Sequence, residues 1–231
     1  MVMPCLFQVS LLMTWGVIMP KVSAVIPAYN EACRIGHTLT QMKPFVDEII
    51  VVDDASSDAT ADISKRYGAT VFTLNSNQGY IHAIKYGFKK ARGDIIITID
   101  ADGEFSANEI PNLIKPIING EADMVQGHRN TIPRPSERAL TWLASKKANV
   151  GDSGTGLRAI KASLAKTLEI NGICICGILA LEVASKGGVI VEIPAQLQQT
   201  NKPRKIAWFH LIQLMYLIPW LFKKHDKTNR G

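Results

Sequence analysis

The sequence lacks glycine-rich phosphate-binding motifs and has few cysteines. Its 17 glycines form neither a Gly-x-Gly-x-x-Gly nor a Gly-x-x-x-x-Gly-Lys pattern, which argues against a Rossmann dinucleotide site and a P-loop. Four cysteines in 231 residues are too few for a disulfide scaffold. Cys174 and Cys176 have no second cysteine pair to complete a tetrahedral zinc site. We therefore expect buried free thiols in a reducing compartment.

Charge is absent from residues 1–20, yet this segment matches no targeting or membrane signal. A signal peptide needs a basic region before its apolar stretch, and none is present. Pro4, Gln8 and Ser10 interrupt the run, which argues against a transmembrane helix. Two interpretations remain, an apolar N-terminal extension or a natural start at Met19.

The basic residues are unevenly distributed. The net charge is +6, yet basic and acidic residues balance up to residue 201, so the excess lies in the C-terminal tail. A neutral body argues against nucleic-acid binding, whereas a basic tail with apolar residues favours an anionic membrane surface. Residues 206–222 are uncharged and include Trp208, Tyr216 and Trp220, which favour the membrane interface. We expect this segment to lie in that interface; the alternative is packing on the domain's own core or on a second subunit.

Between residues 21 and 200, short apolar runs alternate with amphipathic stretches. Apolar, β-branched runs predict strands at 22–26, 48–52, 70–74, 94–99, 123–126, 157–161 and 189–193. Amphipathic stretches predict helices at 31–42, 58–67, 80–91, 108–118, 136–148, 162–168 and 178–186. This alternation predicts a single α/β domain, a mostly parallel sheet flanked by helices, followed by an apolar or amphipathic C-terminal helix.

Three acidic residues, Asp100, Asp102 and Glu104, follow the strand at 94–99. Strand alternation places Asp100 and Asp102 on one side, and Glu104 joins them if the chain stays extended. Such carboxylates tolerate one another when a divalent cation, Mg²⁺ or Mn²⁺, lies between them with substrate phosphates as further ligands. The alternative is a solvated acidic turn.

A second acidic cluster follows the strand at 48–52. Asp53 and Asp54 are costly to bury unless they accept hydrogen bonds, for example from a nucleobase N–H or ribose hydroxyls. The alternative, an Asx-type turn and a helix cap, explains Asp58 equally well. Because ligands bind beyond the carboxyl ends of strands in open α/β sheets, we expect both acidic clusters to face one site.

Four motifs follow one another along the chain: VIPAYNE at 25–31, VVDDASSD at 51–58, NQG at 77–79 and GDIIITIDAD at 93–102. Their order and spacing resemble family 2 glycosyltransferases with the glycosyltransferase-A fold. Later segments are similar to those of polyprenol-phosphate (dolichol-phosphate) sugar synthases: GHR at 127–129, DSGTGLR at 152–158 and VEIP at 191–194. The resemblance covers residues 21–200 as the catalytic domain, and leaves 201–231 as a membrane-associating tail.

The resemblance implies roles for the residues at matching positions. The nucleotide would be bound by Pro27, Tyr29, Glu31, Val52, Asp54 and Ala101. The cation would be held by Asp100, Asp102 and Glu104. The catalytic residues would be Asp102, Arg129 and Asp152, and the lipid phosphate would be bound by Arg129, Arg204 and Lys205. Two departures stand out: Glu104 replaces a common glutamine, and NKPRK at 201–205 replaces a Gly-Glu-Ser-Lys-like segment.

The implied reaction is inverting, metal-dependent transfer of a hexosyl or N-acetylhexosaminyl group from a UDP- or GDP-sugar donor to polyprenyl or dolichyl phosphate. It would take place at the cytoplasmic face of a membrane and serve protein glycosylation. An ionised phosphate attacks the anomeric carbon without a general base, whereas a hydroxyl acceptor needs one, with Asp152 as the candidate.

Two further functions compete with sugar transfer. A nucleotidyltransferase can share a related sheet and an aspartate-bound metal, but the basic glycine-rich loop that it would need after the first strand is missing. A non-catalytic protein that binds a nucleotide sugar or a lipid is the second. The acidic clusters argue against it, and a turnover assay distinguishes it from an enzyme.

Overall fold

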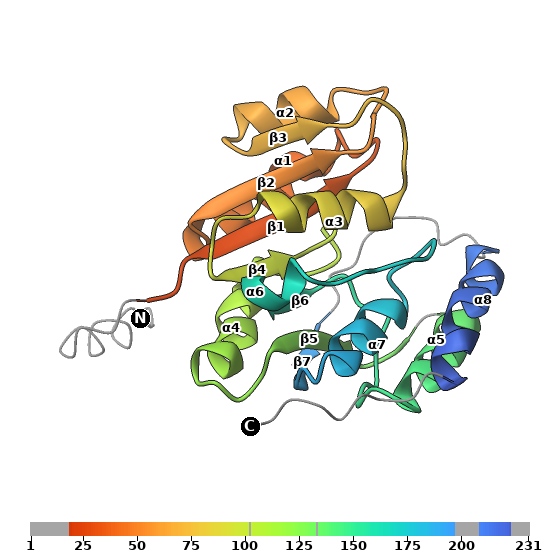
Figure 1. Cartoon of the computed structure of the whole chain (residues 1–231). Coiled ribbons are helices and arrows are strands. Elements are labelled where there is room, and N and C mark those ends of the chain that lie inside the picture. Colours follow the sequence, from red (N-terminus) through yellow and green to blue (C-terminus); the bar gives the residue numbers. More distant parts are fainter. Residues whose placement is uncertain (1–18, 102, 133, 197–207, 223–231) are drawn as a thin grey trace.

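Figure 1 shows the computed structural model of the chain, in which one sheet is flanked by helices. The structure describes residues 19–101, 103–132, 134–196 and 208–222. Within these residues the sheet has seven strands in the order β3-β2-β1-β4-β6-β5-β7. The α/β fold class and the mostly parallel sheet expected from the sequence are therefore confirmed.

The N-terminal half of the sheet is entirely parallel, because β1 pairs with β2 and β4, and β2 pairs with β3. Its strands are β1 (Val22–Ala28), β2 (Glu48–Asp53), β3 (Thr70–Thr73) and β4 (Ile95–Thr98). Its helices are α1 (Ile35–Met42), the 3-10 helix η2 (Lys43–Phe45), α2 (Thr60–Arg66) and α3 (Tyr80–Lys90). Parallel pairing brings the loops that follow these strands to one edge of the sheet.

The C-terminal half is mixed. β6 (Arg158–Lys161) runs antiparallel between β4 and β5 (Met124–Arg129), and β7 (Ile190–Ala195) runs parallel to β5. The helices of this half are η3 (Ala107–Glu109), α4 (Ile110–Ile118), α5 (Pro135–Ser145), α6 (Ala162–Ala165), α7 (Ile178–Ser185) and α8 (Phe209–Phe222). The apolar run at 157–161 predicts β6 but not its direction.

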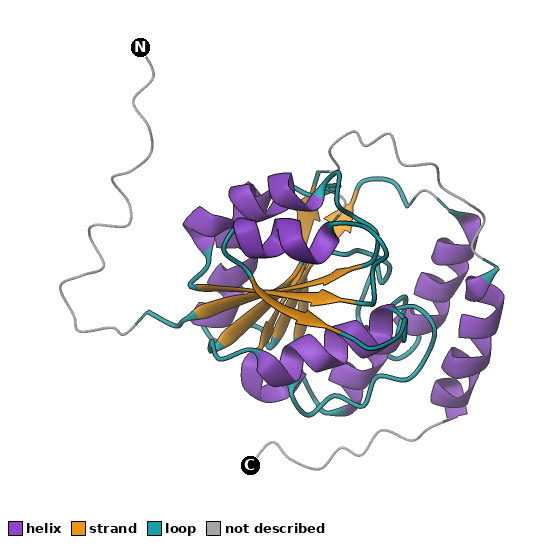
Figure 2. Ribbon diagram, turned by 90° about the horizontal axis from the view of Figure 1, so that it is seen from above, coloured by secondary structure: helices purple, strands orange, loops and turns teal. Residues whose placement is uncertain are grey.

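Helices cover both faces of the sheet, as the view from above shows (Figure 2). On one face α1 and α4 bury residues such as Leu39 and Leu113; on the other α3, α5 and α7 bury residues such as Phe88. Alternate side chains of β1 enter the two cores, with Val25 on the α3 side and Ile26 on the α1 side. The strands β1, β2 and β4 are rich in β-branched residues, as suits strands that are buried on both faces.

The C-terminal helix α8 packs on α5 and α7, and Figure 1 shows it lying along α5 at the outside of the molecule. Its inner side carries His210, Gln213 and Leu217, spaced three and four residues apart and buried. Its outer side is apolar and exposed, with Phe209 at 61% and Met215 at 71% of full exposure. One face of the helix therefore packs on the domain's own core, which was the alternative expectation, and the other face stays exposed. Among the described residues, no helix has the length and apolar composition needed to cross a bilayer.

Several boundaries differ from the expectation by a few residues, and two of them lie close to the polar loops. The helix expected at 31–42 begins at Ile35, because residues 31–34 form a turn in which the Glu31 carbonyl accepts the Arg34 amide at 2.9 Å. The residues 127–129, expected after the fifth strand, form its last part, where Arg129 pairs with Ala195 of β7.

Candidate active site

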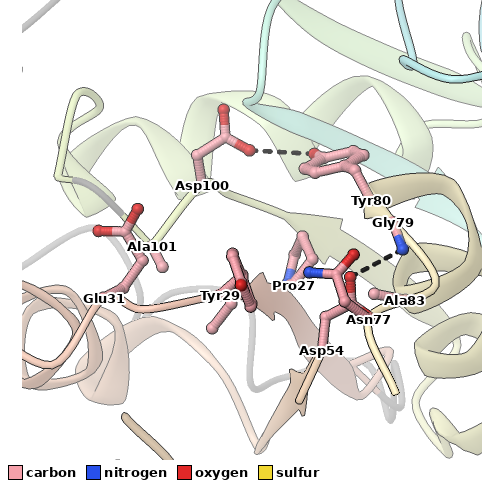
Figure 3. Close-up of a pocket in the computed structure, with 11 residues that line it drawn as sticks. Pro27, Tyr29, Glu31, Asp54, Asn77, Gly79, Tyr80, Ala83, Asp100 and Ala101 are labelled. Atoms are coloured by element: carbon pink, nitrogen blue, oxygen red, sulfur yellow. Dashed lines mark hydrogen bonds between the residues drawn. The ribbon is translucent and has the colours of Figure 1, made fainter. Parts of the chain in front are cut away.

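A pocket of about 340 Å³ opens where β1, β2 and β4 end, which is the edge expected from the sequence. Figure 3 shows side chains from these strand ends and from the start of α3 around it. The residues lining it are Pro27, Ala28, Tyr29, Glu31, Asp54, Asn77, Gly79, Tyr80, Ala83, Asp100 and Ala101. Members of all four N-terminal motifs thus meet in one cavity.

Asp54 shapes this pocket by holding a neighbouring loop. Its two carboxylate oxygens accept the backbone amides of Gln78 at 2.7 Å and Gly79 at 2.8 Å, and the second of these bonds is drawn in Figure 3. Asp54 is only 4% exposed, and these bonds compensate for its burial. The carboxylate thereby fixes the entry to α3, because Gly79 precedes the helix with a φ of +86°.

The loops after β1 and β2 are tied to each other. The Asn30 amide donates to Ser56 Oγ at 2.9 Å, and the Ser57 amide donates to Asn30 Oδ1 at 2.8 Å. Asn30 and Ala55 both adopt positive φ, at +55° and +59°, a conformation that non-glycine residues rarely hold outside a functional or tightly bonded loop. These two hydrogen bonds connect the loops that border the pocket.

Asp58 completes this connection between the two loops. Its carboxylate accepts the amides of Ala32 at 3.1 Å and Thr60 at 3.0 Å. Burial acts to raise the pKa of Asp58, but the hydrogen bond from the Thr60 hydroxyl and those from the two backbone amides outweigh it and lower that pKa. The turn interpretation of Asp58 is confirmed by its bond to the Thr60 amide, whereas the helix cap is wrong, because the N-cap of α2 is Ala59, without a side-chain hydrogen bond.

Asp100 enters the pocket opposite Asp54 and is held by Tyr80 and Gly156. Tyr80 donates its hydroxyl to Asp100 Oδ1 at 3.0 Å (Figure 3). Burial, and then the negative charge of Asp100, raise the pKa of Tyr80 well above its ordinary value, so this phenol keeps its proton. A Cβ at Gly156 would lie 2.1 Å from Asp100 Oδ2, so only glycine permits this position of the carboxylate.

The structure does not confirm the other two expected cation ligands, Asp102 and Glu104. Asp102 lies outside the described residues. Glu104 is partly exposed, and Gly103 before it has a φ of +74°, so the chain turns rather than staying extended. The alternation argument that placed Glu104 beside Asp100 therefore does not apply, and its role as a ligand stays a prediction.

Arg129 and Asp152 form a buried ion pair beside Glu137. Arg129 Nε donates to Asp152 Oδ2 at 2.7 Å, and its Nη2 donates to Asp152 Oδ1 at 2.8 Å and to Glu137 Oε2 at 3.1 Å. Asp152 is fully buried and the other two are at most 5% exposed. Burial alone would raise the pKa of Asp152, but the hydrogen bonds and positive charge of Arg129 outweigh it and lower that pKa. The carboxylate is consequently a weak base, and the guanidinium is already neutralised by carboxylates.

Val52 does not face the pocket. Its side chain is fully buried, and a Cβ on Gly87 of α3 would lie 3.3 Å from Val52 Cγ2. Val52 packs in the core between the sheet and α3, and its contact with the base stays a prediction. Arg204 and Lys205, expected at the lipid phosphate, lie outside the described residues.

Two residues of the site are not predicted by the sequence. Tyr80 is missed because an aromatic at the start of a helix is also typical of core packing. Arg158 stands in the segment at 152–158, and it is 1% exposed, with Nη2 donating to the Ser153 carbonyl at 3.3 Å. Its Nη1 has no hydrogen-bond partner among the described residues, and its positive charge acts on Tyr80 by lowering the pKa. A buried cation with an unused donor beside the pocket is a candidate for binding an anionic ligand.

Comparison with solved structures supports the fold. Glucosyl-3-phosphoglycerate synthase from Mycobacterium tuberculosis superposes with a TM-score of 0.76 over 90% of this chain and 82% of that chain, at 21% identity. A structure of the same enzyme with Mn²⁺, UDP-glucose and phosphoglyceric acid gives a TM-score of 0.75 at 20% identity, over 90% of this chain and 81% of that one. At this identity the likeness establishes the architecture.

Three curated relatives are named as sugar transferases. The chain is 29% identical over 80% of its length to the low-salt glycan biosynthesis hexosyltransferase Agl6 of Haloferax volcanii, covering 48% of that protein. It is 27% identical over 75% of its length to dolichol-phosphate mannosyltransferase of Pyrococcus furiosus, covering 55%. It is 32% identical over 84% of its length to undecaprenyl-phosphate 4-deoxy-4-formamido-L-arabinose transferase of Edwardsiella ictaluri, covering 66%. The chain thus spans about half the length of the first two.

More than half of the chain matches the model of one protein family. Residues 23–163, more than half of the chain, match the model described as Glycosyl transferase family 2. This match begins in β1 and ends in α6, so it contains the strand ends that form the pocket. The chain belongs to the family 2 glycosyltransferases.

Proposed function

We propose that the chain transfers a hexosyl group from a nucleoside diphosphate sugar to a polyprenyl phosphate at a membrane surface. The observation that carries this proposal is the pocket in which Glu31, Asp54 and Asp100 meet at the ends of β1, β2 and β4. The names of the relatives from Pyrococcus furiosus and Edwardsiella ictaluri support a lipid phosphate as the acceptor.

The donor is proposed to lie with its nucleoside between β1 and β2. Pro27 and Tyr29 supply an apolar wall, and the Tyr29 side chain is 49% exposed at the pocket surface, which suits contact with a base. Glu31 supplies a carboxylate at the same wall, able to accept a hydrogen bond from ribose or base. Ala101, small and only 4% exposed, leaves room for the diphosphate next to Asp100.

The residues present suit a divalent cation. Carboxylate oxygens are the donors that Mg²⁺ and Mn²⁺ prefer, and Asp100 offers them inside the pocket where the diphosphate is proposed to lie. Asp100, Asp102 and Glu104 would hold the ion. When bound, it would neutralise charge on the departing nucleoside diphosphate.

The acceptor phosphate is proposed to attack the anomeric carbon directly. A new bond forms between a phosphate oxygen and that carbon, while the bond from the carbon to the donor diphosphate breaks and its electron pair leaves with the nucleoside diphosphate. This single displacement inverts the anomeric configuration and needs no general base, because the attacking phosphate is already ionised. The weak basicity of Asp152 in its pair with Arg129 therefore supports a phosphate acceptor over a hydroxyl acceptor.

The outer side of α8 is the proposed membrane contact. Trp142 of α5, the helix on which α8 packs, is also exposed, at 60%. Apolar and aromatic side chains on one side of a helix favour an orientation in the plane of the interface. Arg204 and Lys205 precede this helix in the sequence and would meet anionic headgroups at the cytoplasmic face.

The reaction is tested with the purified full chain and a panel of donors and acceptors. UDP-glucose, UDP-N-acetylglucosamine and GDP-mannose are each offered with polyprenyl phosphate, the matching polyprenol, or 3-phosphoglycerate, with Mn²⁺, Mg²⁺ or EDTA. We expect mass spectrometry to detect a glycosylated lipid phosphate with one donor and a divalent cation. Transfer to polyprenol or to 3-phosphoglycerate instead would overturn the proposed acceptor.

The membrane contact is tested separately by flotation with vesicles that contain anionic lipid. Phe209→Glu with Met215→Glu on the outer side of α8 should abolish flotation while leaving the unfolding midpoint unchanged. Ile118→Glu on α4 is the matched control, because Ile118 is also apolar and exposed but lies on another helix. Equal flotation of both variants would exclude α8 as the contact.

A further inference from the structure

Cys174, Cys176 and His210 form a cluster that the proposed reaction does not use. Their sulfur and imidazole nitrogen atoms all lie within 4.8 Å of one another. Cys174 and Cys176 precede α7, and His210 is the second residue of α8, so two distant segments meet here. No sequence motif joins them, because 33 residues without a further cysteine or histidine separate Cys176 from His210.

The separations suit one tetrahedral ion. Zinc–sulfur bonds of about 2.3 Å and zinc–nitrogen bonds of about 2.0–2.1 Å place neighbouring ligand atoms about 3.5–3.8 Å apart. Cys176 Sγ and His210 Nε2 are 3.9 Å apart, and both side chains are buried, at 7% and 5% exposure. Closing the cluster around an ion therefore needs only small movements of side chains.

The imidazole of His210 is oriented as a metal ligand would be. Its Nδ1 lies 2.6 Å from Ser136 Oγ at the start of α5, and this contact turns Nε2 toward the thiols. Ligating histidines use the second ring nitrogen in this way, because the hydrogen bond fixes both the tautomer and the ring plane.

The backbone that carries the thiols is also held by α8. Gln213, fully buried one turn after His210, accepts the amides of Ile173 at 3.0 Å and Cys174 at 3.2 Å. Its Nε2 donates to the Cys176 carbonyl at 3.4 Å. The two sulfurs are thereby fixed relative to the helix that supplies the imidazole, which is the preorganisation that a metal site requires.

We propose that Cys174, Cys176 and His210 bind a zinc ion that fastens α8 to the catalytic domain. Two thiolates and an imidazole are the donor set that zinc favours, and water or another donor would take the fourth position. Gly154 connects the cluster to the active site, because a Cβ there would lie 3.6 Å from Cys176 Sγ and 3.1 Å from Arg129 Nη2. The ion would thus set the position of the proposed membrane helix relative to Arg129.

Metal binding is tested on the full chain kept reduced by a phosphine. After exposure to zinc and gel filtration, we expect elemental analysis to find about one zinc ion per chain. Replacement by Co²⁺ should give thiolate-to-cobalt charge transfer and the visible bands of a tetrahedral ion. No retained zinc and no charge-transfer band in the wild-type chain would overturn the proposal, whatever the sugar-transfer assay shows.

Variants assign the ligands. Cys174→Ser, Cys176→Ser and His210→Ala should each lose the charge-transfer band or the retained zinc, whereas Cys33→Ser should keep both, because Cys33 is exposed and lies after β1. Ser136→Ala should lower zinc affinity about 10–100-fold and leave the stoichiometry at saturation unchanged. Circular dichroism of each variant separates loss of metal from loss of fold.

Counting the reactive thiols can contradict the zinc site. If the chain purified without reductant lacks two reactive thiols, and the same chain binds no zinc once reduced, Cys174 and Cys176 form a disulfide pair and the proposal fails. Retained zinc that resists Cys176→Ser and His210→Ala would equally exclude this cluster.

Discussion

In the N-terminal half of the sheet Asp54 is buried against backbone amides, whereas in the C-terminal half Asp152 is buried against an arginine. The amides of Gln78 and Gly79 that bind Asp54 belong to the loop of the next strand. The Asp152 carboxylate shares Arg129 with Glu137. The first arrangement shapes a pocket, and its partners are backbone amides that a side-chain substitution does not remove. In the second, losing one charged side chain leaves the opposite charge buried without a partner.

The largest effect expected from this difference follows removal of the shared arginine. Arg129→Met leaves Asp152 buried without its cation and leaves Glu137 with Arg134 alone, so the free energy of unfolding should fall by about 3–5 kcal/mol. Urea unfolding followed by circular dichroism measures it. Arg92→Met is the control, because Arg92 is 81% exposed in its pair with Glu48 and should cost at most about 1 kcal/mol. Similar losses in both variants would contradict the comparison.

Asp100→Asn tests the N-terminal pocket for function rather than for stability. It keeps the shape of the side chain but removes the charge proposed to hold the cation, so turnover should fall by about 100-fold or more. Initial rates with the active donor measure the loss, and the urea midpoint should stay that of the wild type. Full activity of the unmodified chain in excess EDTA would contradict the cation that this prediction assumes.

The two sides of α8 offer the next contrast. Leu217 is 1% exposed and packs in the core beside α7, so Leu217→Ala should lower the free energy of unfolding by about 2–3 kcal/mol. Met215 is 71% exposed, and Met215→Ala should change it by less than about 0.5 kcal/mol. Thermal and urea unfolding of both variants give the values. An equal effect would mean that the packing of α8 on the domain is not maintained in solution.

Much of the N-terminal half could be predicted because its signals are local. Each strand ends in polar residues that follow it directly, and parallel pairing then brings Glu31, Asp54 and Asp100 to one pocket. Strand order alone is enough to predict that these three carboxylates lie close together. The contact of Val52 with the base rests on the family resemblance alone and stays a prediction.

The C-terminal half was less predictable because its contacts join distant residues. The partners of Arg129 are 8 and 23 residues away, and Cys176 meets His210 from 34 residues away. Nothing in the local pattern of a helix or strand indicates which of several carboxylates an arginine will select. The antiparallel β6 is equally non-local, since direction depends on the path of the chain and not on apolar periodicity.

The pH dependence of stability gives a smaller test of the Arg129–Asp152 pair. The pKa of Asp152 is lower in the folded chain than in the unfolded chain, so the unfolded state binds more protons in acid. The stabilisation is complete above about pH 5, since an unfolded aspartate titrates near 3.9, and is lost as the pH falls through the lower folded pKa. Urea midpoints measured down to pH 3 should fall less steeply for Asp152→Asn than for the wild type. Parallel curves would contradict the linkage.

The smallest effect is expected at an exposed ion pair of the N-terminal half, where Lys65 Nζ and Asp62 Oδ1 of α2 lie 3.8 Å apart with both side chains more than 60% exposed. Water screens such a pair, so Asp62→Asn should change the free energy of unfolding by less than about 0.5 kcal/mol. A double-mutant cycle with Lys65→Met isolates the interaction itself, because each single variant alone also alters solvation and helix propensity. The same cycle on Arg129→Met and Asp152→Asn should give a coupling several times larger, since both side chains are almost completely removed from water. A coupling above about 1 kcal/mol at the exposed pair would contradict the view that burial is what makes the other ion pair stronger.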